Sequence, residues 1–164
     1  MKSIFCFLLS VLLLFSLAGC KTANQSEVSF YYCRTSDQYQ YFETDAVIQA
    51  EQRDLQGHMD DLRYMIGLYL AGPMSETLQI PFSKSTKLLS VQQEDDHIFI
   101  ELSDHSNVLT DSEFTLACAA LSITCLDFTD STDITISAGG RSVTMNANNI
   151  ILSDILPPQE TIGG

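Results

Sequence analysis

An uncharged apolar segment at the N-terminus decides how much of this 164-residue chain can take part in a fold. Lys2 is followed by a run without charge, residues 4–19, which leads into the sequence Leu-Ala-Gly-Cys at 17–20. A helix needs about twenty apolar residues to cross the hydrocarbon core of a bilayer, so this run is short for a stable span. A basic start, a short apolar stretch and a small-residue exit are typical of a secretory signal peptide.

The exit at residues 17–20 resembles a bacterial lipobox, and polar residues follow it at once. In signals of this kind a diacylglyceryl group is attached to the cysteine thiol, and cleavage falls just before the cysteine. The resemblance implies that Cys20 is the lipidated first residue of the mature chain, carrying fatty acids such as palmitate, and that residues 1–19 are removed. An ordinary signal peptide with a chance cysteine is the alternative interpretation.

Two acyl chains hold a protein on a membrane far more firmly than one. We therefore expect the mature protein to be anchored on the outer face of the bacterial cell membrane. Residues 20–27 would form a polar linker, residues 28–156 one folded domain and residues 157–164 a flexible tail.

The charge balance is strongly acidic. The chain has 8 basic and 21 acidic residues, and loss of Lys2 with the signal leaves a net charge near −14. Nucleic-acid binding needs a basic patch, so this class of partner is excluded. Anionic lipid heads should repel the domain. Basic protein partners, or solubility alone, are the uses that remain for this charge.

Three cysteines remain in the mature chain besides Cys20, namely Cys33, Cys118 and Cys125. The last two are seven positions apart on one expected helix, about 10 Å along its axis, which is too far for a disulfide. A bridge from Cys33 to either stays open at this point. Buried free thiols that act as small apolar side chains are the favoured interpretation.

Aromatic and β-branched residues predict a strand at 28–33, and weaker patterns predict strands at 39–42 and 46–55. One face of the first strand is expected to hold Val28, Phe30 and Tyr32. Apolar residues at spacings of three and four then predict a helix that ends at Gly72 and Pro73. Its buried stripe comprises Met59, Leu62, Met65, Ile66 and Tyr69.

A hairpin is predicted at 87–102, with an acidic turn at 94–96. A second helix should begin after the capping residue Thr110, and a strand at 134–137 should turn at Gly139 and Gly140. The apolar stripe of that helix comprises Phe114, Ala117, Cys118, Leu121, Thr124, Cys125 and Phe128. This order predicts an α+β fold, with two helices packed on one mostly antiparallel sheet. Its helix–hairpin–helix–strand core is preceded by one or two strands.

Residues 62–138 resemble a GerMN domain. The resemblance is carried by Leu-Tyr-Leu-Ala-Gly-Pro at 68–73, the hairpin segment 80–104 with its Thr-Lys-Leu-Leu-Ser-Val strand, and the closing strand 134–137. It implies a non-enzymatic envelope protein without cofactors, built like the small ring-forming modules of spore envelopes. It also implies partners among proteins of sporulation, germination or cell-wall assembly.

Side chains that could carry chemistry are scattered along the chain. A metal could be bound by Asp95, Asp96, His97, Asp104 and His105, but the expected strand sets His97 and Asp104 roughly 23 Å apart, too far to share one ion. No Gly-x-Ser-x-Gly elbow is present, and the thiols lack basic neighbours in sequence. We predict no metal, cofactor or catalytic residue.

The leading hypothesis is protein–protein contact in the envelope, for which a free strand edge could also join copies of the chain. A hydrolase is the least favoured alternative. The other alternative is a cell-wall glycan or small-ligand binder. Its face would be lined by Phe30, Tyr31, Tyr32, Tyr39, Tyr41 and Phe42, some of which must belong to the core.

Overall fold

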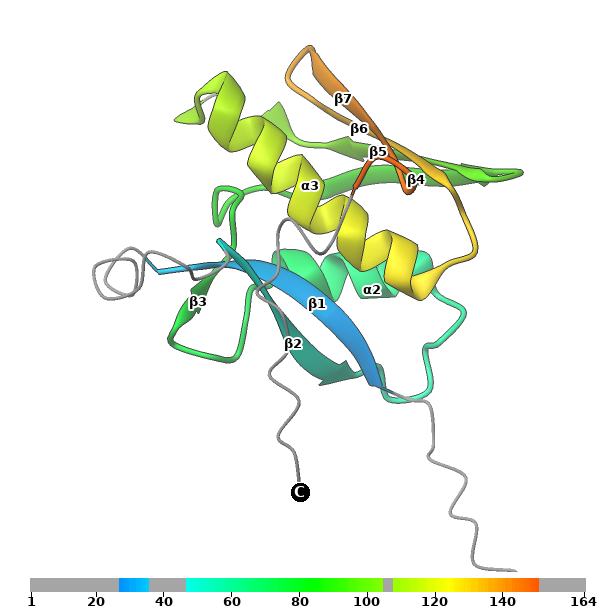
Figure 1. Cartoon of the computed structure of the whole chain (residues 1–164), viewed down its shortest axis with the longest axis horizontal. Coiled ribbons are helices and arrows are strands. Elements are labelled where there is room, and N and C mark those ends of the chain that lie inside the picture. The colour runs from blue at the N-terminus through cyan, green and yellow to red at the C-terminus, as the bar shows by residue number, and fades with distance from the viewer. Residues whose placement is uncertain (1–26, 36–46, 105–107, 151–164) are drawn as a thin grey trace, which may run out of the picture.

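The computed structural model describes residues 27–35, 47–104 and 108–150 (Figure 1). The described residues form helices and strands in the α+β combination that the sequence predicts. In chain order the elements are β1 (Glu27–Arg34), β2 (Ile48–Asp54), α2 (Leu62–Leu70), β3 (Leu78–Gln79), β4 (Leu88–Glu94), β5 (His97–Leu102), α3 (Asp111–Phe128), β6 (Asp133–Ala138) and β7 (Arg141–Asn146). Neither described helix is both long and apolar enough to cross a bilayer.

The strands form two sheets where the sequence predicted one. An antiparallel sheet has the order β2-β1-β3, and a second sheet has the order β4-β5-β6-β7. In the second sheet only β5 and β6 run parallel, because α3 connects them as a crossover. In Figure 1 the four-stranded sheet lies above α3 and the three-stranded sheet lies below it.

Two hydrophobic clusters form the core, and they lie on different faces of α3. One buried cluster joins Phe114 and Leu121 of α3 to Ile98 and Ile134 of the four-stranded sheet, and also contains α2. A smaller cluster joins another face of α3 to β1 and β2. Its buried members are Tyr31, Cys33, Ile48, Ala120 and Ile123. The predicted stripe of α3 is buried except for Phe128, which is only partly buried, and the helix buries more of its circumference than one stripe.

Local signals place the element ends close to the predicted positions, except that α2 begins at Leu62, so Met59 of its predicted stripe precedes the helix and is partly buried. Asp61 caps α2 by accepting a hydrogen bond from the Tyr64 N–H at 2.9 Å. Thr110 and Glu113 form a reciprocal capping box at the start of α3, as the sequence predicts. Gly140 has φ +80° in the β6–β7 turn, a left-handed conformation that favours glycine.

Several predictions fall outside the described residues. These are the signal segment 1–19, Cys20, the strand at 39–42 and the tail at 157–164. Residue 27, placed in the linker by the sequence, is described and begins β1.

Candidate functional site

The four-stranded sheet has a buried face and an exposed face. Along β5 the residues Ile98, Ile100 and Leu102 are buried, while Phe99 and Glu101 between them are exposed. The same alternation buries Ile134, Ile136 and Ala138 of β6. Side chains of successive strand residues point to opposite faces, so the exposed residues share one surface.

The register arranges this surface in three cross-strand rows of four side chains. We call these twelve residues the outer face. The rows are Ser90–Glu101–Ser137–Ser142, Gln92–Phe99–Thr135–Thr144 and Glu94–His97–Asp133–Asn146.

Hydrogen bonds link neighbouring strands across the outer face. His97 Nε2 lies 2.8 Å from Thr135 Oγ1, which lies 2.8 Å from Thr144 Oγ1. The amide of Asn146 donates to Asp133 Oδ1 at 2.8 Å. These contacts hold the polar side chains in place, which reduces the conformational entropy that a partner must remove on binding.

The outer face carries negative charge. Its three carboxylates are Glu94, Glu101 and Asp133, and none of its twelve residues is lysine or arginine. Hydrogen bonds from Asn146 and Thr132 lower the pKa of Asp133, so this carboxyl stays ionised at neutral pH.

An aromatic pair lies among these polar groups. The rings of His97 and Phe99 stack with their centroids 4.1 Å apart and their planes 8° from parallel. Phe99 keeps 38% of its surface exposed. An apolar contact surrounded by fixed polar groups is suited to binding a partner.

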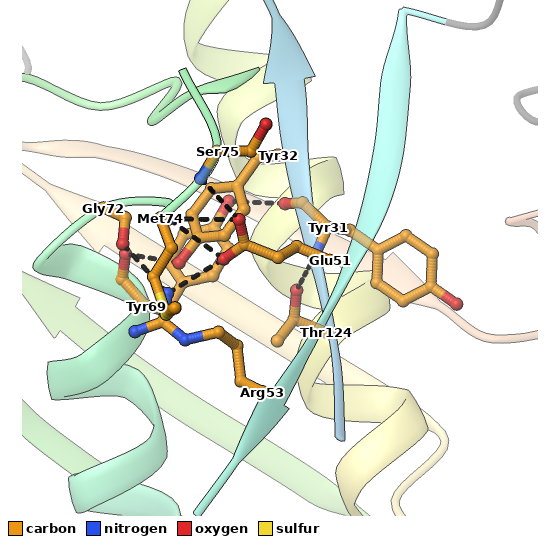
Figure 2. Close-up of polar contacts among 9 residues, drawn as sticks. All are labelled: Tyr31, Tyr32, Glu51, Arg53, Tyr69, Gly72, Met74, Ser75 and Thr124. Atoms are coloured by element: carbon orange, nitrogen blue, oxygen red, sulfur yellow. Dashed lines mark hydrogen bonds and ion pairs between the residues drawn. The ribbon is translucent and has the colours of Figure 1, made fainter. Parts of the chain in front are cut away.

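The interior holds a polar network that supports the fold (Figure 2). The backbone N–H of Tyr31 in β1 donates to Thr124 Oγ1 at 3.0 Å, and the Tyr69 hydroxyl donates to the Tyr31 carbonyl at 3.0 Å. The Tyr32 hydroxyl in turn donates to the Tyr69 carbonyl at 3.1 Å. The backbone N–H and C=O groups of Tyr31 are therefore satisfied by one hydroxyl from each helix, that of Thr124 in α3 and that of Tyr69 in α2.

The second part of this network fixes the loop after α2 (Figure 2). Glu51 accepts the N–H groups of Met74 and Ser75 and pairs with Arg53 at 2.9 Å. Arg53 also donates to the Gly72 carbonyl at 3.2 Å. Burial acts to raise the pKa of Glu51, but these hydrogen bonds and the arginine charge outweigh it and lower the pKa below its ordinary value.

The candidate metal ligands do not form a cluster in the part of the chain that is described. Asp95 and Asp96 form the β4–β5 turn, and His97 directs Nε2 to Thr135. No three acids, histidines or cysteines among the described residues are placed to hold an ion. His105 lies outside those residues.

The thiols are buried and free, as the sequence favours. Burial raises the pKa of Cys33 to about 11 and that of Cys118 to about 12, and it raises the pKa of Cys125 further. All three therefore stay protonated at neutral pH, whereas a nucleophile requires the thiolate. The bridge from Cys33 to Cys118 or Cys125 is not formed.

The alternative of a glycan-binding face lined by N-terminal aromatic residues is wrong for those aromatic residues that the structure describes. Phe30 and Tyr32 are completely buried, and Tyr31 is 7% exposed. They pack in the two cores because both faces of β1 are covered. The remaining members, Tyr39, Tyr41 and Phe42, lie outside the described residues.

A surface pocket of about 670 Å³ lies between the end of α2 and the segment 78–84. Lys84 is the one charged residue among those that line it. Ser83 also lines this pocket, but its hydroxyl lies 2.9 Å from Ser85 Oγ, and among the described residues no hydrogen bond joins Ser83 to Lys84 as a nucleophile and its base would require. The outer face is the better candidate for a functional site.

Comparisons with solved structures identify the fold. The tandem GerMN domains of the sporulation protein GerM from Bacillus subtilis match with a TM-score of 0.50 and 18% identity, over 70% of this chain and 39% of that chain. A Clostridium perfringens protein with a provisional assignment as a lipoprotein matches with a TM-score of 0.48 and 20% identity, over 75% of this chain and 88% of that chain. No family model matches, and no curated sequence does. The chain thus resembles GerMN domains in fold, and it spans well under half of the GerM structure.

Proposed function

We propose that this chain, whose fold resembles that of GerMN domains, is a lipid-anchored extracytoplasmic protein that acts through protein–protein contacts rather than catalysis. Cys20 carries the anchor, and the acidic domain lies outside the bacterial cell membrane. The setting is envelope or spore assembly, or germination. Two observations support the proposal, namely the lipobox-like sequence at 17–20 and an exposed sheet face of fixed polar side chains.

The outer face is the contact surface in this proposal, and it carries the argument. It presents three carboxylates around the His97–Phe99 pair. Charge complementarity favours a partner that offers lysine or arginine around an apolar contact. The same charge disfavours anionic lipid heads and nucleic acid.

Site-specific photocrosslinking in intact membranes tests this surface. A photoreactive residue at Gln92 lies on the outer face, and one at Gln52 lies on an exposed position of the other sheet. We expect a discrete protein adduct from position 92 that is weakened by Glu101→Gln, and no such adduct from position 52. The same pattern from both positions, or none from position 92, would contradict the proposal.

Binding of cell-wall glycan is the second candidate function. The stacked His97–Phe99 pair beside the hydroxyls of Thr135 and Thr144 favours it, because an aromatic face next to hydrogen-bonding groups suits a sugar ring. Retention on purified peptidoglycan, lost with Phe99→Ala, would support this function. Equal recovery with and without peptidoglycan would exclude it.

A further inference from the structure

The edge strands of the two sheets differ in their ability to accept another strand. β3 has two residues, and β4 has a bulge between Leu88 and Ser90 and ends at Glu94. β2 carries Glu51 and Asp54. Short strands, bulges and charges all discourage edge pairing. β7 is a regular strand of six residues and contains no carboxylate.

The backbone groups that β7 directs away from β6 follow from the register. The Ala147 N–H donates to the Thr132 carbonyl at 2.8 Å, which makes these two residues a hydrogen-bonded pair. Such pairs alternate along an antiparallel ladder, so the N–H and C=O groups of Ser142, Thr144 and Asn146 point away from β6. The Asn146 carbonyl already accepts from two N–H groups in the following turn. The order of the sheet places no described strand beyond β7.

We infer that β7 pairs antiparallel with β7 of a second copy of this chain. Opposite residues of a two-fold pair must lie on the same face, so the axis passes at a residue and not between two residues. The two central residues of β7, Val143 and Thr144, are the positions that let the two strands overlap most. Either register allows four backbone hydrogen bonds from the outward groups. With the axis at Thr144, Val143 lies opposite Met145 of the second copy.

The charge of the chain favours β7 over the other edges for this contact. Each mature copy carries a net charge near −14, so copies repel one another over long distances. β7 contributes no acid at the point of closest approach, and its one charged side chain, Arg141, lies over the Phe114 ring and 3.6 Å from Asp111 of α3. Salt screens the long-range repulsion but has little effect on backbone hydrogen bonds. We therefore expect association to strengthen as the salt concentration rises.

The pairing would also extend the outer face. Because opposite residues share a face, the two outer faces would lie on the same side of one continuous eight-stranded sheet. This contact between copies goes beyond the proposed function. A protein adduct at position 92 can form whether or not two copies pair through β7. The two proposals can therefore fail separately.

Single-cysteine variants of the full chain test the pairing in membranes under mild oxidation. Thr144→Cys should crosslink if the axis is at Thr144, and Val143→Cys if it is at Val143, because directly opposite residues have Cα atoms about 4.5–5.5 Å apart. Gln92→Cys on β4 is the control. The described native thiols are buried and should not react.

We expect one of the two β7 variants to give a disulfide-linked dimer at least several-fold more abundant than the control gives. No dimer from either β7 variant would overturn the inference, as would equal dimer from Gln92→Cys. Coverage of this edge by residues 151–164 would also keep both β7 variants monomeric, and that result would likewise overturn the inference.

Charge reversal provides a second test in detergent solution by sedimentation. Thr144→Lys and Thr144→Glu should each associate several-fold more weakly than the unmodified chain, since either places like charges near the two-fold axis. Mixing the two variants should restore association as a heterodimer. Unchanged association of both single variants would contradict the pairing.

Discussion

Replacing Thr124 by valine removes one hydroxyl from the interior of α3. Thr124 is completely buried, and its hydroxyl accepts the Tyr31 N–H at 3.0 Å while donating to the Ala120 carbonyl at 3.0 Å. Valine keeps the branched shape, so the main effect is a buried N–H without an acceptor. Leaving such a donor unsatisfied costs about 1–3 kcal/mol of the free energy of unfolding.

Thr115 on the same helix provides a matched control. Its hydroxyl also donates to the carbonyl four residues earlier, that of Asp111, at 2.8 Å, but it lies on the exposed side of α3. Thr115→Val therefore loses the same kind of local bond and leaves the Tyr31 N–H satisfied. We expect a change within about 0.5 kcal/mol, as for most surface substitutions.

Urea unfolding of both variants, followed by circular dichroism, measures the difference. Thr124→Val should lower the midpoint without changing the slope, and its loss should exceed that of Thr115→Val by about 1–3 kcal/mol. Equal losses in the two variants would refute the role of this hydroxyl in joining α3 to β1.

Three further predictions concern the interior. Glu51→Gln should lower stability at neutral pH by about 1–3 kcal/mol, because the loop after α2 and Arg53 lose a charged acceptor. The lowered pKa of Glu51 contributes stability above about pH 4.5, which is lost as the pH falls through the folded-state pKa, so urea unfolding at pH 3 should show a smaller difference between the variants. Cys118 and Cys125 should resist a thiol reagent in the native state and react fully in denaturant; rapid native labelling would contradict their burial. Ile134→Ala should cost about 2–5 kcal/mol in the same urea assay, and a loss below 1 kcal/mol would argue against its complete burial.

The sequence predicted the features of the fold that depend on local patterns. Alternation predicted that Val28, Phe30 and Tyr32 share a face of β1, and all three are buried in one cluster. Capping chemistry predicted the start of α3 at Thr110. In each case the signal lies within a few residues of the element that it specifies.

Contacts between distant segments were not predictable in the same way. β3 consists of Leu78 and Gln79, too short for any periodic signal, and it gives β1 a second partner. Because β3 could not be predicted, nothing in the sequence indicated that β1 and β2 belong to a sheet of their own. α3 also buries Ala120 and Ile123 outside the predicted stripe, because β1 packs against that side.

The outer face could be predicted only in part. Alternation along β5 indicates that Phe99 and Glu101 point away from the core. It cannot show that Thr135 and Thr144 lie in the same row as Phe99, because that depends on the register of three strands. The predicted lipid site at Cys20 depends on the local sequence alone and lies outside the described residues.

Metabolic labelling with a tagged fatty acid tests the anchor at Cys20, on which the proposed location of the protein depends. We predict that the unmodified chain incorporates the label, fractionates with membranes and loses residues 1–19, whereas Cys20→Ser does none of these. A mature chain without label, released in soluble form from cells that label their other lipoproteins, would contradict the proposed anchor.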